Sequence, residues 1–201
     1  MGARARTLEN VTADEKMVKA LSALRRALDK TGVPWMVIGG IAVIAHGVPR
    51  QTQDVDATLW GPAIHADHLL PLLAKAKIRP RPEHSVEVAR HTQVYLMRHE
   101  PTEVDLDIGF SWLPFEREAM DRAIEVVFNG VPICIATPED LIVYKAGAWR
   151  DRDRDDIERL LTLYAPTINT ERVLGLVRQI GEALDDPQRV VILEQMIREA
   201  Q

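Results

Sequence analysis

The segment DVDATL, residues 54–59, alternates polar with apolar side chains, and this period of two constrains the fold more than any other feature of the sequence. Alternate side chains of a strand lie on the same face, about 7 Å apart. We therefore predict a strand from Gln53 to Trp60, with Asp54 and Asp56 on one face and Val55 on the other. Because two adjacent carboxylates repel each other, presenting them together adds no stability without a counter-charge. A bound divalent cation is the simplest such counter-charge.

The same arrangement recurs in residues 103–108, where Asp105 and Asp107 alternate with apolar residues. If the two strands are neighbours in one sheet, all four carboxylates converge on one face. Carboxylate oxygens suit Mg²⁺ or Mn²⁺, which complete their coordination with water and substrate phosphates. The sequence thus predicts a metal site whose candidate ligands are Asp54, Asp56, Asp105 and Asp107.

The other patterns in the first two thirds of the chain favour an α/β fold with a mixed sheet. Apolar residues at helical spacing predict a helix over 13–30, which Thr12 and Glu15 would open as a capping box. The same spacing predicts a helix over 63–76, interrupted by Pro71. Short apolar or alternating runs predict further strands at 35–38 and 92–98, and a hairpin over 126–135 that turns at Asn129-Gly130.

The remainder of the chain shows helical patterns without a strand. Thr137 followed by Pro138 matches an N-cap and a first helical residue, and helices broken near Pro166 and Pro187 continue to Gln201. We therefore expect an α/β core over residues 1–135 and a C-terminal helical region over 136–201 that packs on it.

Gly39 and Gly40 stand between the predicted strand 35–38 and a short helix. Glycines at such a junction let backbone N–H groups approach a phosphate, and a helix N-terminus adds partial positive charge. A tight strand-to-helix turn is the simpler explanation of the pair taken alone. Together with Asp54 and Asp56, however, the pair favours a phosphate cradle beside a two-metal carboxylate site, which is the equipment of nucleotidyl transfer.

Two runs of the sequence resemble a known superfamily. The run GGIAVIAHGVPRQTQDVD, residues 39–56, resembles the nucleotidyltransferase signature of the DNA polymerase β superfamily, in which a Gly-Gly or Gly-Ser pair precedes an Asp-x-Asp pair. Its R-x-T-x-D-x-D form is similar to the subgroup that includes AbiEii-type and MenT-type toxins of bacterial toxin–antitoxin systems. The run TPEDLIVYKAGAWRDRDRDDIERLL, residues 137–161, resembles a helical segment of that subgroup. The resemblance implies the nucleotidyltransferase fold, a mixed sheet flanked by helices.

The resemblance also implies roles for the residues of the first run. Gly39 and Gly40 would hold a nucleoside triphosphate, and Asp54 and Asp56 would bind two metal ions. Arg50 and Thr52 belong to the same nucleotide-binding motif. The third carboxylate of the family falls on the run VDLD, where we favour Asp105, although Asp107 faces the same way.

In the second run, Lys145 would reach the triphosphate as a point charge. Asp153 and Asp156 match acidic positions at which they would orient Lys145 or the acceptor. The plain alternative is that Lys145 and the run DRDRDD form a solvated, self-paired helix surface.

The favoured function is a magnesium-dependent nucleotidyltransferase that transfers a nucleoside monophosphate to an acceptor hydroxyl. The resemblance implies a toxin that acts on RNA, above all tRNA, or on a protein, with a cognate antitoxin as partner. A small-molecule acceptor such as an aminoglycoside, and a non-catalytic antitoxin-like protein of the same fold, are the alternatives.

The charge balance limits how a nucleic acid would be met. The chain carries 25 Lys and Arg against 30 Asp and Glu, a net charge of -5, so any such contact must be local. The segment 75–99 is a candidate, because it holds six Lys or Arg against two Glu. A single cysteine and the lack of a signal-peptide or membrane-span pattern favour a cytoplasmic protein.

Overall fold

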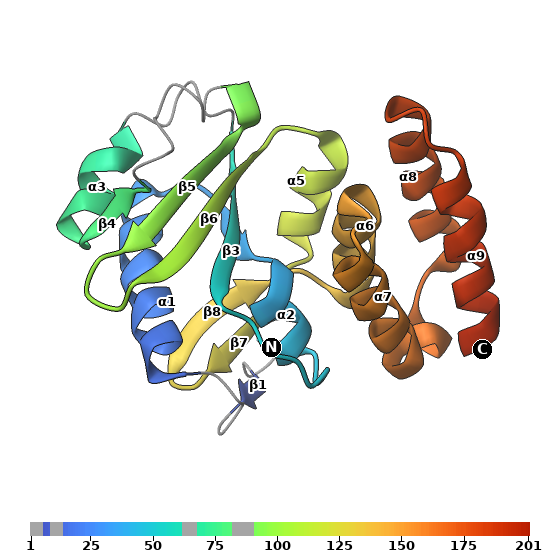
Figure 1. Ribbon diagram of the computed structural model, residues 1–201, viewed down its shortest axis with the longest axis horizontal. Helices are drawn as coiled ribbons and strands as arrows, with labels where there is room; N and C mark the ends of the chain where they lie inside the picture. The colour runs from blue at the N-terminus through green and yellow to red at the C-terminus, as the bar shows by residue number, and fades with distance from the viewer. Residues whose placement is uncertain (1–5, 9–13, 62–67, 82–90) are drawn as a thin grey trace.

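The computed structural model describes residues 6–8, 14–61, 68–81 and 91–201, which form one mixed sheet with helices around it (Figure 1). In this described part the sheet has eight strands in the order β1-β7-β8-β2-β3-β6-β5-β4. The strands are β1 (Arg6–Leu8), β2 (Trp35–Val37), β3 (Asp54–Trp60), β4 (Ile78–Pro80), β5 (Val94–His99), β6 (Val104–Ser111), β7 (Ile124–Phe128) and β8 (Val131–Ile135). The predicted α/β class with a mixed sheet is confirmed.

The two acid-bearing strands are neighbours at the centre of the sheet. β3 pairs with β6 in parallel, so that Asp54 lies opposite Asp105 and Asp56 opposite Asp107. Residues in register on adjacent strands project to the same face. The four carboxylates therefore share one face, as predicted, while Val55 is fully buried on the other.

Helices α1 (Glu15–Leu28) and α3 (Leu69–Lys75) cover the apolar face of the sheet. The N-cap of α1 is Asp14, whose side chain accepts a hydrogen bond from the Lys16 amide. The predicted cap, Thr12, and the first part of the predicted helix 63–76 lie outside the described residues. Within α3, Pro71 is accommodated in the first turn, where a missing N–H leaves no helix bond unmade.

The predicted strand at 35–38 is β2, and helix α2 (Gly39–Ala45) begins directly at the glycine pair. The predicted hairpin is also present, because β7 and β8 pair antiparallel around Asn129 and Gly130, which both have positive φ. The three-residue strands β1 and β4 were not predicted, because their sequences, RTL and IRP, lack the continuous apolar run that marks the equally short β2. The eight-residue helix α5 (Pro114–Asp121) was not predicted either.

From Thr137 onward the described chain is helical, as predicted. It forms α6 (Pro138–Ala148), α7 (Asp151–Tyr164), α8 (Thr170–Ala183) and α9 (Gln188–Ala200), and α6 contacts α2 of the sheet region (Figure 1). The Thr137 side chain caps α6 by accepting from the Asp140 amide. One break was not predicted: α6 ends at Trp149, which adopts a left-handed conformation with φ 56°. No helix in the described ranges is both long and apolar enough to span a membrane.

Candidate active site

The glycine pair lies directly against the strand that carries the acidic pair. Gly39 has φ 63°, and a Cβ at this position would overlap the carboxylate of Asp56. A Cβ on Gly40 would overlap the side chain of Thr52. The pair therefore makes the turn from β2 into α2 and packs directly against Asp56 and Thr52, where a side chain would not fit, while its role as a phosphate cradle stays a prediction.

Asp54 and Asp56 lie at the start of β3, facing one pocket. Thr52 donates a hydrogen bond to the Asp54 carboxylate at 2.9 Å, which fixes its orientation. Burial, together with the negative charges of Asp54 and Asp107, raises the pKa of Asp56 to about 6. The charged form of Asp56 is thus destabilised by its neighbours. A bound cation would stabilise this form, because its positive charge offsets the repulsion between the carboxylates.

On the neighbouring strand β6, both aspartates contact arginines. Arg98 donates to Asp105 at 2.7 Å, and Arg81 donates to Asp105 at 3.2 Å and to Asp107 at 2.7 Å. The hydrogen bond from Arg98 is the main reason why the pKa of Asp105 lies below its ordinary value. Asp105 thus contacts Arg98 and Arg81 and lies opposite Asp54, whereas Asp107 contacts Arg81 and lies opposite Asp56 across the ladder. Across the described residues no three His, Cys, Asp or Glu side chains are already gathered as a metal site.

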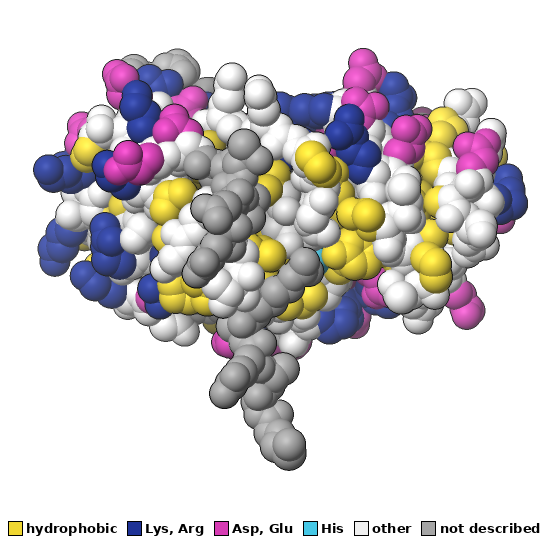
Figure 2. Space-filling view, turned by 90° about the horizontal axis from the view of Figure 1, so that it is seen from below, with side chains coloured by type: hydrophobic (Ala, Val, Ile, Leu, Met, Phe, Trp, Pro, Cys, Tyr) yellow, Lys and Arg dark blue, Asp and Glu magenta, His cyan; other side chains and the backbone are white. Residues whose placement is uncertain are grey.

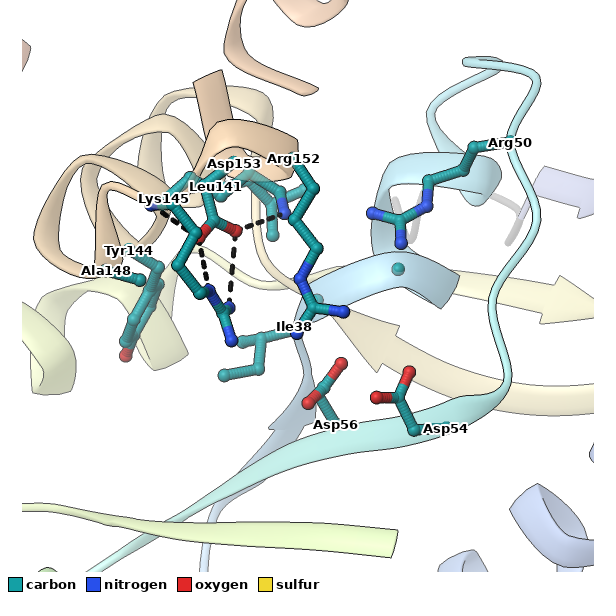
Figure 3. A pocket seen from close by; sticks show the side chains of 13 residues that line it. Ile38, Arg50, Asp54, Asp56, Leu141, Tyr144, Lys145, Ala148, Arg152 and Asp153 are labelled. Atoms are coloured by element: carbon teal, nitrogen blue, oxygen red, sulfur yellow. Dashed lines mark hydrogen bonds and ion pairs between the residues drawn. The ribbon is translucent and has the colours of Figure 1, made fainter. Parts of the chain in front are cut away.

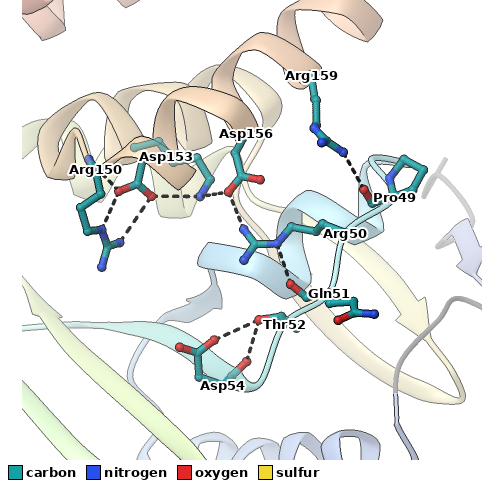
Figure 4. Close-up of polar contacts among 10 residues, drawn as sticks. Pro49, Arg50, Gln51, Thr52, Asp54, Arg150, Asp153, Asp156 and Arg159 are labelled. Atoms are coloured by element: carbon teal, nitrogen blue, oxygen red, sulfur yellow. Dashed lines mark hydrogen bonds and ion pairs between the residues drawn. The ribbon is translucent and has the colours of Figure 1, made fainter.

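The predicted lysine lies in the interior. Lys145, on α6, is buried and forms ion pairs with Asp156 at 2.6 Å and with Asp153 at 3.4 Å. Arg50 contacts Asp156, and Arg150 contacts Asp153 at 2.6 Å (Figure 4). Although burial raises it, the hydrogen bond from Arg150 and the charge of Lys145 hold the pKa of Asp153 below its ordinary value.

The two predicted acidic residues of α7 are therefore not part of a solvated surface. Helical spacing puts Asp153 and Asp156 on the inner face, whereas Asp151 and Asp155 of the same run are exposed. The alternative of a wholly solvated, self-paired run is wrong for these two positions, because both carboxylates pair with the buried Lys145.

Most of the predicted residues line one pocket between the sheet and the helical region (Figure 3). Gly39, Gly40 and Arg50 form one side, Asp54 and Asp56 the floor, and Lys145 and Asp153 the opposite side. Thr52, Asp105, Asp107 and Asp156 lie outside the lining, although Thr52 and Asp156 contact residues that form it.

Sequence reasoning missed two cations of this pocket and four other lining residues, Ile38, Leu141, Tyr144 and Ala148. Arg150 and Arg152 come from the start of α7, and Figure 3 shows Arg152 extending toward the two aspartates. Both arginines alternate with aspartates in the run RDRDRDD. A run that mixes positive and negative charges is typical of a solvent-exposed helix face, so the sequence did not single these arginines out. Ile38, Leu141 and Tyr144 supply an apolar border to the same pocket.

The arrangement of backbone and carboxylates defines a class of enzyme. A glycine turn that opens a helix, beside paired carboxylates on a central strand and cations facing them, is suited to nucleotidyl transfer. The family model "Nucleotidyl transferase of unknown function (DUF2204)" matches residues 17–198. The chain belongs to this family, and the protein is a nucleotidyltransferase.

Solved structures support the fold. The chain is similar to the antibiotic-resistance factor ANT(2″)-Ia in its solution structure, with a TM-score of 0.56, 20% identity, and coverage of 84% of this chain and 94% of that chain. It is also similar to an antigenic nucleotidyltransferase-like protein from Paracoccidioides brasiliensis, with a TM-score of 0.50, 19% identity, and coverage of 88% and 93%. Comparison with curated protein sequences finds no match.

Proposed function

We propose that the protein transfers a nucleoside monophosphate from a nucleoside triphosphate to an acceptor hydroxyl, with Mg²⁺ held by Asp54, Asp56 and Asp107. The observation that carries this proposal is the shared pocket of the glycine pair, the β3 carboxylates and Lys145. Asp107 replaces Asp105 as our choice of third ligand, because it lies in register with Asp56 and its charge raises the pKa of Asp56.

The donor set fits a hard divalent cation, since it consists of carboxylate oxygens that repel one another in the structure. Such a cation supplies activation of the acceptor hydroxyl and neutralises charge on the triphosphate. Arg150, Arg152 and Lys145 bind the triphosphate oxygens from the opposite side of the pocket. Asp153 and Asp156 act as positioning residues, because they hold Lys145 and Arg50 in place.

The proposal includes a biological setting, in which the enzyme is a toxin that modifies RNA, above all tRNA, or a protein and is neutralised by a cognate antitoxin. Its support is the R-x-T-x-D-x-D motif of Arg50, Thr52, Asp54 and Asp56. Induced expression in a bacterial host tests this setting. Growth arrest by the wild type and not by Asp56→Asn supports it, and equal growth of both strains contradicts it.

The assay for the activity itself uses the four nucleoside triphosphates labelled at the α-phosphate, with Mg²⁺ and either total RNA, total protein or an aminoglycoside. We expect label in RNA or protein. In the same assay Asp107→Asn is expected to lose at least about 100-fold in rate, whereas Asp105→Asn loses less than about tenfold, because several kcal/mol of charge stabilisation depends on a metal ligand. The reverse order would assign the third ligand to Asp105.

A second variant tests the close approach at the glycine pair. Gly39→Ala adds a methyl group where the Asp56 carboxylate lies, so it is expected to displace that carboxylate and abolish transfer. Gly32→Ala is the matched control, because Gly32 also has positive φ (68°) but has no atom within 4 Å of an added Cβ. The control should cost only about 1 kcal/mol of backbone strain and retain activity. Equal activity of the two variants would contradict the assigned contact.

A further inference from the structure

A second pocket, remote from the carboxylates, is lined by four cations and a histidine from three segments. It lies where the end of α1, the end of α3 and the adjoining ends of β4 and β5 meet. Arg26 and Lys30 come from α1 and the turn after it, Lys75 and Lys77 from the last residue of α3 and the turn after it, and His99 from β5. Within the described chain no acidic residue lines this pocket. Figure 2 shows Lys and Arg side chains gathered at this end of the molecule, at the left of the view.

The cations of this pocket are not used to stabilise the fold. Among the described residues Lys30, Lys75 and Lys77 have no ion pair, and Arg26 donates only to the Ser22 hydroxyl. Burial, with the positive charges of Arg26 and Lys77, lowers the pKa of His99. All four cations are exposed, so solvent screens their mutual repulsion and they remain available to an anion.

Edge strand β4 adjoins this pocket through Lys77, which directly precedes it. On β4 itself Arg79 is exposed and Ile78 is buried, and Arg81 directly follows the strand. Across the sheet Arg79 lies opposite Arg98, Arg98 opposite Asp105, and Asp105 opposite Asp54. The strands β4, β5, β6 and β3 are successive in the sheet. At about 4.8 Å per strand, the backbone of Arg79 on the edge strand is therefore roughly 14 Å from that of Asp54.

We infer that this surface, defined by Arg26, Lys30, Lys75, Lys77 and Arg79, binds the phosphate backbone of a single-stranded polynucleotide acceptor whose end reaches the carboxylates. The pocket lies on the face of the sheet that α1 and α3 cover, so a flexible single strand would pass the sheet edge at Lys77 to reach Arg79, which lies on the carboxylate face in register with Arg98 and Asp105. Arg79 lies 4.0 Å from Glu100, but both side chains are exposed, so this weak pair leaves the arginine available to a phosphate. A polycationic acceptor such as an aminoglycoside would be repelled by the same cations. The inference rests on the proposed function for the role of acceptor, but the binding surface is testable without catalysis.

The test measures binding of a fluorescently labelled single-stranded oligoribonucleotide to the full chain by anisotropy, without nucleotide or Mg²⁺, over a range of salt concentrations. The variants are Lys75→Glu in the pocket and Arg79→Glu on β4. Arg178→Glu on α8 is the matched control, since it makes the same charge change at an exposed position of another region. We expect affinity to fall at least about tenfold in the pocket variant, and the salt slope to decrease by about 0.7 for each phosphate that the variant no longer neutralises. The control should remain within about twofold of the wild type.

Unchanged affinity and salt slope in the pocket and β4 variants would overturn the inference, as would the absence of oligonucleotide binding by the wild type. An equal loss of affinity in Arg178→Glu would also overturn it, because the effect would then reflect net charge alone. A wild type that transfers nucleotide to another acceptor without binding the oligonucleotide contradicts this inference alone. A wild type that binds the oligonucleotide but transfers no label to any acceptor contradicts the proposed function and leaves the binding surface standing.

Discussion

Asp56→Asn is expected to reduce nucleotidyl transfer at least about 100-fold and, at the same time, to make the metal-free protein more stable. The two effects have one cause, the burial of Asp56 beside Asp54 and Asp107, which raises its pKa to about 6. An acid whose pKa is raised on folding loses stability as the pH rises from its unfolded value, 3.8, through its folded value. Above pH 6 the charged form therefore costs up to about 3 kcal/mol, and the asparagine variant avoids this cost.

The measurement is thermal unfolding in EDTA between pH 4 and pH 8. We expect the melting temperature of Asp56→Asn to exceed that of the wild type by up to about 6–12 °C at pH 7, and the difference to vanish near pH 4. Asp151→Asn is the matched control, because Asp151 on α7 is 96% exposed at its side chain. It should change neither stability nor activity. A variant that is no more stable than the wild type at pH 7 would show that the repulsion around Asp56 is already relieved without a metal.

Asp156→Asn is expected to lower the free energy of unfolding by about 3 kcal/mol. Asp156 pairs with the buried Lys145 at 2.6 Å and also contacts Arg50. The neutral asparagine therefore removes a negative charge that both Lys145 and Arg50 contact. Removing one partner of a buried ion pair typically costs about 3–5 kcal/mol, and Asp153 still offers Lys145 a partner at 3.4 Å. The melting temperature should fall by about 6–12 °C.

A second substitution separates the effect of pairing from the effect of packing. In the Asp156→Asn background, Lys145→Met removes the uncompensated buried charge and should recover about 1–3 kcal/mol, measured as a double-mutant cycle in urea. Asp155→Asn, at the exposed neighbouring position of the same helix, serves as the control for a helix effect. Additive destabilisation in the double variant would mean that the pair contributes nothing specific. Asp156 lies outside the pocket lining, so its variant should raise KM for the nucleotide more than it lowers kcat.

Local patterns predicted the elements that carry the chemistry. The alternation at 54–59 and 103–108 predicted β3 and β6, and Thr137-Pro138 predicted the start of α6. The domain boundary at residue 135 and the roles of the site residues stay predictions. Patterns of this kind depend on contacts within a few residues, so a single sequence is sufficient to recognise them. The three-residue strands β1 and β4 show no such pattern. They are strands because each pairs with a neighbouring strand at an edge of the sheet.

Tertiary structure distinguishes carboxylates that are equivalent in sequence, and our proposal of Asp107 depends on it. Asp105 and Asp107 have the same spacing and face, but Arg98 on β5 contacts Asp105, whereas Arg81, which follows β4, contacts both. Likewise, the run 151–156 does not distinguish its buried acids from its exposed ones until Lys145 is placed against the inner face of α7. The sequence by itself determined which residue types stand at which spacing, and hence the class of chemistry. Which charges lie together depends on long-range packing, and Coulomb interactions depend on those distances and on burial rather than on separation along the chain.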